Sequence, residues 1–527
     1  MAEAKHPPLV EALLDPGAYP EPVGAIKLAE THISYLFLIG DYVYKIKKPV
    51  NFGFLDFTTL EKRCYYCEQE LELNRRMSPE VYLRVVEIRE QDGNYSIDGD
   101  GDTVEYAVKM LQLPQSRTMS LLLKEGQVTE EQVRRLAVKI ADFHKRAATG
   151  PEITRLGDIA AVRENVEENF SQTEKYIGKC LSQDMFDDLA VYSRAFLEAR
   201  EEIFRQRADA GRVRDCHGDL HTAQIFLENG ISIIDCIEFN QRFRYSDVAE
   251  DIAFLVMDLD FHQCPDLSRT FVQTYVQESG DPGVMELLDF FKSYRAYVRG
   301  KVNSFLLGDL ELTDDDREEA ASVARDYFQL AHSYTRVFPR PALALVTGIT
   351  GTGKSTIAQE LARRWDFSYI SSDVTRKALA GIEPEEHRYE PFGEGIYSAE
   401  FSQRTYESMF QQAENQLKVG CSVVLDGTFR RSGERLGATA VARKLGVEAW
   451  IVQCRLPDHI ARQRLESREA EDASVSDGRW ELYHQQKQDW EPVTEVPPDR
   501  YIPLDTSGPV QENMRELLQQ LFRSVLG

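Results

Sequence analysis

A glycine-rich motif that ends in lysine and serine restricts the fold of this sequence more than any other feature. Residues 348–355 read Gly-Ile-Thr-Gly-Thr-Gly-Lys-Ser, a full match to the pattern G-x-x-x-x-G-K-[ST]. The glycines let successive backbone N–H groups turn inward around phosphate oxygens, and a helix that begins at Lys354 directs the positive end of its dipole at them. An apolar run precedes the motif and a helical pattern follows it, so the sequence predicts a strand, a phosphate-binding loop and a helix.

The predicted nucleotide-binding residues of this loop are Gly348, Gly351, Gly353, Lys354, Ser355 and Thr356. Lys354 is expected to reach the β- and γ-phosphates and to assist transfer, and Ser355 is expected to bind Mg²⁺. Asp426 ends the apolar run SVVLD, which places a carboxylate at the end of a buried strand. Such a carboxylate assists Mg²⁺ directly or through water, so Asp426 is the second predicted metal ligand.

Two charged residues follow the strand pattern that comes after the loop. Asp373 and Arg376 stand at the carboxyl end of that strand, where ligands bind in open α/β sheets. Asp373 is expected to accept a hydroxyl proton and Arg376 to bind an anionic substrate group, although a helix N-cap is an alternative role for Asp373. Arg464 and Arg468 lie on a later basic helix, either as a lid over the transferred phosphoryl group or on a solvated face.

A segment with two prolines divides the sequence into two regions. A helical pattern with an acidic first turn starts after Thr313, and residues 338–341 (Phe-Pro-Arg-Pro) break it, because proline removes a backbone donor and restricts the preceding residue. Beyond the break, strand and helix patterns alternate, which is typical of a parallel α/β sheet. The first region places β-type segments before a mainly helical part. We therefore expect domains at 1–336 and 337–527.

The second region, over about 341–510, resembles the small-molecule P-loop kinases. This group holds gluconate kinase-like, adenylylsulfate kinase-like, polynucleotide 5′-kinase-like and zeta-toxin-like members. The resemblance implies that Asp373 and Arg376 face the substrate and that Arg464 and Arg468 are lid residues.

A second constellation of phosphotransfer residues lies at 216–238, CHGDLHTAQIFLENGISIIDCIE. Asp219, in a loop, can accept a hydroxyl proton, and Asp235, at the end of a second strand, can chelate Mg²⁺. The segment resembles the Brenner-type loop of the aminoglycoside phosphotransferase and choline kinase relatives of protein kinases. Gln224 stands where that family has asparagine, so its carbonyl oxygen would bind the metal from one methylene further out.

The same resemblance extends over about 30–305. Lys45 matches the ATP-binding lysine of the third strand, although Lys47 lies on the same face by the two-residue period of a strand. Glu70 is the expected ion-pair partner, with Glu68 as the alternative. Asp247 and Asp251 match acidic positions that support the catalytic loop in this family, and His144 matches the family's helix before that loop.

Composition narrows the class of protein. The chain has 527 residues with 62 Lys and Arg against 87 Asp and Glu, and its net charge of −25 argues against binding to nucleic acid or anionic membranes through bulk charge. No apolar run approaches the ~20 residues of a membrane helix. Eight cysteines are too few for a disulfide framework, and Cys64 and Cys67 are expected to pack on one helix face. We expect a cytoplasmic protein.

The combined interpretation is an α+β bilobal protein-kinase-like domain followed by an α/β P-loop NTPase domain with a parallel sheet. Each domain would transfer the γ-phosphoryl group of ATP, with Mg²⁺, to a hydroxyl group of a small molecule. Two alternatives stay open. One is a nucleotide-sensing regulator with a pseudokinase first domain and an ATP-hydrolysing P-loop domain, and the other is a zeta-toxin-like or polynucleotide-kinase-like enzyme. The sequence indicates neither the acceptor nor the oligomeric state.

Overall fold

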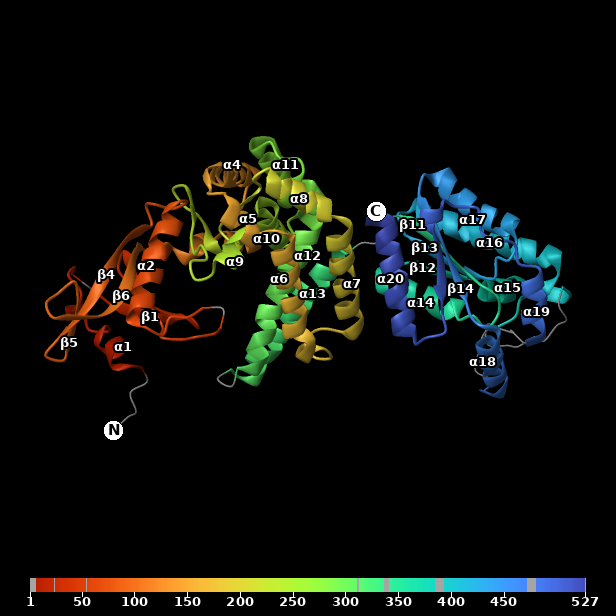
Figure 1. Ribbon diagram of the computed structural model, residues 1–527, viewed down its shortest axis with the longest axis horizontal. Helices are drawn as coiled ribbons and strands as arrows, with labels where there is room; N and C mark the ends of the chain where they lie inside the picture. The colour runs from red at the N-terminus through yellow and green to blue at the C-terminus, as the bar shows by residue number, and fades with distance from the viewer. Residues whose placement is uncertain are drawn as a thin grey trace. The chain divides into compact units, whose positions relative to one another are not determined.

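Figure 1 shows the computed structural model, which describes residues 6–22, 24–53, 55–309, 312–335, 341–383, 393–471 and 480–526. The chain forms two compact units. The first contains Met1–Leu181 and Glu201–Tyr334, and the second contains Ser182–Arg200 and Thr335–Gly527. Within the described ranges, no helix is long and apolar enough to cross a membrane.

After a short helix α1 (Pro8–Ala12), the first unit forms an antiparallel sheet in the order β1-β2-β3-β6-β4-β5. Its strands are β1 (Ile26–Glu30), β2 (Ser34–Ile39), β3 (Tyr42–Lys47), β4 (Tyr82–Gln91), β5 (Asn94–Ile97) and β6 (Asp102–Leu111). Helix α2 (Leu60–Arg75) packs against this sheet, and the side chain of Thr59 caps it by accepting a hydrogen bond from the Lys62 N–H. Cys67 of α2 is buried in the core beside β6, which is the packing role expected for it, and all eight cysteines are free thiols.

The remainder of the first unit is mainly helical, as the sequence predicts. Short strands β7 (Val213–Asp215), β8 (Ile225–Leu227) and β9 (Ile231–Ile233) frame the loops that carry Asp219 and Asp235. The helices of this part include α3 (Met119–Lys124), α4 (Glu130–Arg146), α10 (Val248–Phe261), α11 (Pro265–Ser279), α12 (Val284–Phe305) and α13 (Asp314–Ser333). Helix α10 is buried along almost its whole length and packs against α11 and α12.

The second unit contains the predicted parallel sheet, in the order β12-β13-β11-β14-β15. Its strands are β11 (Ala342–Thr347), β12 (Ser368–Ser371), β13 (Val423–Gly427), β14 (Glu448–Arg455) and β15 (Tyr501–Asp505). Every residue of β11 is buried, which explains its unbroken apolar sequence, because a central parallel strand is covered on both faces. The helices are α14 (Lys354–Trp365), α15 (Ser372–Ala380), α16 (Ala399–Lys418), α17 (Ser432–Leu445), α18 (Asp458–Glu471), α19 (Trp480–Gln488) and α20 (Val510–Leu526).

Helix α7 (Gln183–Ala199) belongs to the second unit although it lies within the sequence of the first region. Its Asp188 is 2% exposed and lies 2.8 Å from Arg364 of α14, whose side chain is 4% exposed. Tyr192 packs on Phe522 of α20, with ring centres 5.2 Å apart. A buried ion pair and an aromatic contact therefore join α7 to two helices of the P-loop unit.

A fragment that begins at residue 335 should consequently be destabilised. Leaving one partner of a buried ion pair unpaired costs about 3–5 kcal/mol, which corresponds to a fall in Tm of roughly 10 °C for a unit of this size. Thermal unfolding of 335–527, compared with the same unit in the full chain, measures this effect. A synthetic peptide of residues 182–200 should restore stability to the fragment, and a scrambled peptide should not. Equal Tm values without α7 would contradict its structural role.

Candidate active sites

The phosphate-binding loop lies between β11 and α14, where the motif places it. Gly353 directly precedes α14 with a φ of 77°, a left-handed conformation that favours glycine. At Gly348 the constraint is space, because a Cβ would lie 2.8 Å from the carbonyl oxygen of Cys454 on β14. Lys354 and Ser355 occupy the first turn of α14, so their side chains and the free N–H groups of the helix N-terminus meet at the loop.

Asp426 lies at the end of β13, the neighbour of β11 in the sheet. It is 2% exposed, and its Oδ2 accepts a hydrogen bond of 2.7 Å from the Tyr369 hydroxyl. Its Oδ1 is buried and has no hydrogen-bond partner among the described residues. Burial raises the pKa of Asp426, although Lys354, Tyr369 and Ser355 lower it in part. An unsatisfied carboxylate oxygen next to Ser355 fits the chemistry of a Mg²⁺ site.

A cavity of about 780 Å³ adjoins the phosphate-binding loop. Its lining includes Lys354, Asp373 and Arg376, so three predicted site residues meet there. Asp373 is the second residue of α15, and Ser371 holds the N-cap position, so Asp373 is not the N-cap of this helix. Its half-buried carboxylate is therefore left facing the cavity near Lys354.

Arg376 lines the cavity, and part of its guanidinium group is already hydrogen-bonded to neighbouring protein atoms. Its Nη1 donates to the backbone oxygen of Ile396 at 2.7 Å and to the Ser402 hydroxyl at 3.1 Å. Its Nε is buried without a hydrogen-bond partner in the described part of the chain. Arg376 thus supports the wall of the cavity, and its Nε is a donor that a ligand could use.

Arg464 lies at a different cavity, of about 540 Å³, which it shares with Gly353, Thr356 and Asn513. Its Nη2 donates to the backbone oxygen of Thr506 at 2.8 Å. In this conformation Arg464 lies at the start of α14 and is not part of the lining of the cavity that contains Asp373. The predicted lid role of Arg468 depends on a side chain that lies outside the described residues.

Gln486 is a contact of the phosphate-binding loop that the sequence analysis missed. Its Oε1 accepts a hydrogen bond of 2.8 Å from the backbone N–H of Thr350. Gln486 belongs to α19 and also lines the larger cavity. No motif surrounds it, so no signal in the sequence could have identified it.

In the first unit, Lys45 of β3 lies between two carboxylates. Its Nζ is 2.8 Å from Glu70 Oε1 and 2.7 Å from Asp235 Oδ1. Burial alone would lower the pKa of Lys45, but Asp235 and Glu70 raise it well above its usual value. The predicted lysine, its helix partner and the predicted metal ligand are therefore in direct contact.

The alternatives left open by the sequence differ clearly in the structure. Glu68 is exposed, whereas Glu70 is fully buried and also lies 2.7 Å from Lys47. Lys47 is 1% exposed and forms its other ion pair with Glu238. Of the two lysines, Lys45 is the one paired with Asp235, while Lys47 forms a buried link that the sequence did not indicate.

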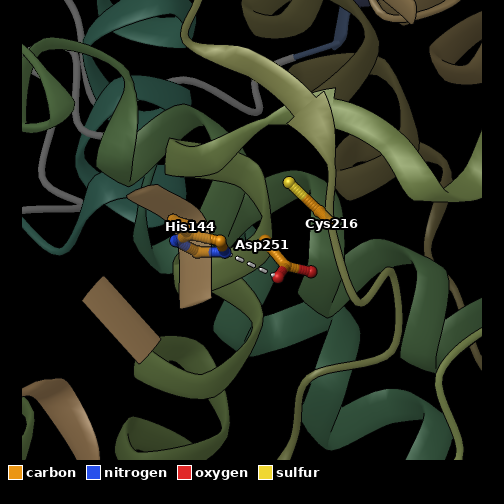
Figure 2. Close-up of side chains that lie close together, drawn as sticks. All are labelled: His144, Cys216 and Asp251. Carbon is orange, nitrogen blue, oxygen red and sulfur yellow. Dashed lines mark hydrogen bonds and ion pairs between the residues drawn. The ribbon is translucent and has the colours of Figure 1, made fainter. Parts of the chain in front are cut away.

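The loop that carries Asp219 is supported by a buried carboxylate, shown in Figure 2. Asp251 accepts hydrogen bonds from the backbone N–H groups of His217, at 3.1 Å, and Gly218, at 2.8 Å. His144 lies 3.0 Å from the same carboxylate. His144, Cys216 and Asp251 lie close enough together to bind a metal ion. However, His144 and Asp251 already use their polar atoms in the hydrogen bonds that hold this loop. Asp247 instead binds Arg207 and caps α10.

Asp219 itself keeps one third of its side chain exposed. Burial would raise the pKa of Asp219, but His221, Arg299 and His217 lower it below its usual value. The His221 Nε2 lies 3.4 Å from the Asp219 carboxylate. Asp219 is therefore an accessible carboxylate that stays ionised at neutral pH.

Gln224 and Asp235, the two predicted metal ligands of the first unit, lie next to each other. The Gln224 Nε2 lies 3.4 Å from Asp235 Oδ2, a long hydrogen bond. The side chain of Asp235 is 44% exposed, and Tyr82 accepts a hydrogen bond from its backbone N–H at 3.1 Å. An exposed carboxylate beside an amide supplies oxygen ligands of the kind that Mg²⁺ prefers.

Comparison with known proteins gives matches in both units. Residues 105–288 match the phosphotransferase enzyme family, and residues 343–492 match a family described as an AAA domain. Uncharacterized proteins of Mycobacterium tuberculosis and Mycobacterium bovis are each 32% identical to this chain over 428 residues. These alignments cover 80% of this chain and 81% of each relative.

Solved structures with similar folds also match each unit separately. The GDP complex of aminoglycoside 2′-phosphotransferase-IIIa is 14% identical, with a TM-score of 0.38, and the match covers 62% of this chain and 99% of that one. A gluconokinase from Sinorhizobium meliloti 1021 is 19% identical, with a TM-score of 0.26, and the match covers 36% of this chain and 95% of that one.

Proposed function

This chain belongs to the same family as the mycobacterial proteins, with a kinase-like phosphotransferase domain followed by a P-loop kinase domain, and we propose that it is a bifunctional ATP-dependent kinase. The predicted resemblance to both kinase groups is confirmed, and the chain is a phosphotransferase of the kinase type. We further propose that each domain transfers the γ-phosphoryl group of ATP to a hydroxyl group of a small molecule.

The contact of Lys45 with Glu70 and Asp235 is the observation that most supports activity of the first domain. A lysine held in this way is oriented to bind the nucleotide phosphates. The acceptor hydroxyl gives its proton to Asp219, and its oxygen forms a bond to the transferred phosphorus while the bond to the leaving diphosphate breaks. Mg²⁺, held by Asp235 and Gln224, would neutralise charge on the phosphates.

The second domain has an equivalent division of roles. Lys354 and the N–H groups at the start of α14 bind the phosphates, and Ser355 and Asp426 would hold Mg²⁺. Asp373 takes the proton of an acceptor bound in the larger cavity, and the Nε of Arg376, which has no partner among the described residues, orients that acceptor. That cavity carries both signs of charge, including Arg430, Arg431, Asp489 and Glu491, which fits a small polar acceptor better than a nucleic-acid strand.

Release of ADP in a screen of hydroxyl-containing metabolites tests the proposal. The full chain, Asp219→Asn and Lys354→Ala should be compared with each metabolite. Acceptors of the first domain should lose activity only with Asp219→Asn, and acceptors of the second only with Lys354→Ala. ADP release that no metabolite increases would favour the nucleotide-sensing regulator instead.

Gln224→Asn tests the departure from the family pattern. We expect equal or higher activity of the first domain, because asparagine restores the usual distance between the amide oxygen and the metal. Gln224→Ala removes the ligand and should lower activity and apparent Mg²⁺ affinity. ADP release at several Mg²⁺ concentrations measures both. A large loss with Gln224→Asn would show that the longer side chain, which reaches Asp235, has a role of its own.

A further inference from the structure

Two arginines of α12 lie beside the loop that carries Asp219. The guanidinium group of Arg295 is 5.0 Å from the ring centre of Phe254. His221, which contacts the Asp219 carboxylate, lies 5.2 Å from the same ring. Arg299 follows one helical turn after Arg295. Burial raises the pKa of Asp219 and His221 lowers it, and Arg299 lies close enough to Asp219 to lower this pKa further. Arg299 is therefore near the group proposed to receive the acceptor proton, and Arg295 contacts the same Phe254 ring as its neighbour His221.

These arginines retain unused hydrogen-bond donors. Arg295 is 5% exposed, and its Nε is buried without a hydrogen-bond partner among the described residues. Its Nη2 forms an ion pair of 2.9 Å with Glu250. The Nε of Arg299 is likewise buried and unpaired within the described residues. Buried guanidinium donors are costly to leave unpaired, so two on one helix face favour a ligand that accepts hydrogen bonds.

The guanidinium groups of Arg295 and Arg299 favour one chemical class of acceptor. A carboxylate or phosphate group accepts paired hydrogen bonds from guanidinium groups, which strengthens binding and fixes orientation. An ammonium group at the same place would lie near the positive charge of Arg299, whereas the charge of Arg295 is paired with Glu250. Arg299 thus disfavours cationic acceptors such as amino sugars or choline.

Resting on the proposed function of the first domain, we infer that its acceptor is a hydroxyl compound bearing a carboxylate or phosphate group that Arg299 and Arg295 bind. The anionic group holds the acceptor while its hydroxyl lies next to Asp219. The two arginines are then specificity-determining residues, whose effect falls on the acceptor and not on ATP.

Calorimetric titration of the full chain with graded probes tests this inference. Lys354→Ala is included in every protein so that the P-loop domain does not contribute, and a non-hydrolysable ATP analogue is present. The probes are glycerol, glycerate, glycerol 3-phosphate and kanamycin, which separate neutral, carboxylate, phosphate and cationic chemistry. We expect glycerate or glycerol 3-phosphate to bind more tightly than glycerol, and kanamycin not to bind. Arg299→Gln should weaken anion binding by about tenfold, and Arg299→Lys should weaken it less.

The outcomes distinguish this inference from the proposed function. Unchanged affinity of Arg299→Gln for the ATP analogue shows that the variant is folded. Failure of both anions to bind, equal anion binding in Arg299→Gln, or kanamycin binding would overturn the inference. Arg299-dependent anion binding without Asp219-dependent ADP release from any acceptor would instead retain the anion site and reject the kinase activity of the first domain.

Discussion

Titration of the full chain with Mg·ATP should give two bound nucleotides per chain, and Lys354→Ala should reduce this number to one. The lysine supplies a charge-assisted interaction with the β- and γ-phosphates at the start of α14. Its loss should weaken nucleotide binding in the P-loop domain by roughly 10- to 100-fold. Isothermal titration calorimetry at nucleotide concentrations below the weakened Kd measures the change in stoichiometry.

The converse variant removes the other nucleotide. Asp235→Ala combined with Lys45→Ala deletes two groups that contact each other at 2.7 Å, and should also leave one bound nucleotide, now in the P-loop domain. Effects in separate sites combine independently, so all three substitutions together should abolish binding. Lys444→Ala is a matched control, because Lys444 is exposed and pairs only with surface Glu414 in the described contacts. One nucleotide per wild-type chain at saturation would reject the two-kinase proposal.

Local motifs predicted the phosphate-binding features well, for a physical reason. The glycines of 348–355, the strand before them and the helix after them are neighbours in sequence, so their spacing determines their geometry. The unbroken apolar sequence of β11 likewise indicated a strand covered on both faces. The parallel sheet and the order of strands and helices followed from such local patterns.

Choices that depend on distant partners were beyond the sequence. Lys45 and Lys47 share a strand face, and only the positions of Asp235 and Glu238 distinguish them. The role of α7 depends on α14 and α20, whose residues lie far along the chain. Gln486 and Arg299 stand in no motif at all. Each becomes recognisable only when folding brings a second segment against it.

Asp219→Asn should abolish phosphoryl transfer by the first domain while leaving ATP bound. Asparagine preserves the shape of the side chain but cannot accept the hydroxyl proton, and loss of a general base lowers kcat by about 10²- to 10⁴-fold. Lys45, Glu70 and Asp235, which hold the nucleotide side of the site, are unchanged. Steady-state ADP release with an acceptor of the first domain, together with calorimetric affinity for ATP, measures the two effects separately.

The pH dependence provides an independent check on the same carboxylate. The net effect of burial, His221 and Arg299 is to lower the pKa of Asp219, so this carboxylate is ionised at every pH above the usual carboxyl pKa of about 4. Protonation of Asp219 should therefore not reduce kcat/KM until the pH falls below about 4. Asp266→Asn, a change at an exposed surface carboxylate, is the matched control and should retain full activity. A decline centred near pH 6 that disappears in Asp219→Asn would mean that Asp219 titrates far above its usual value, opposite to the effect of its cationic neighbours. Full activity of Asp219→Asn would remove it from the proton transfer altogether.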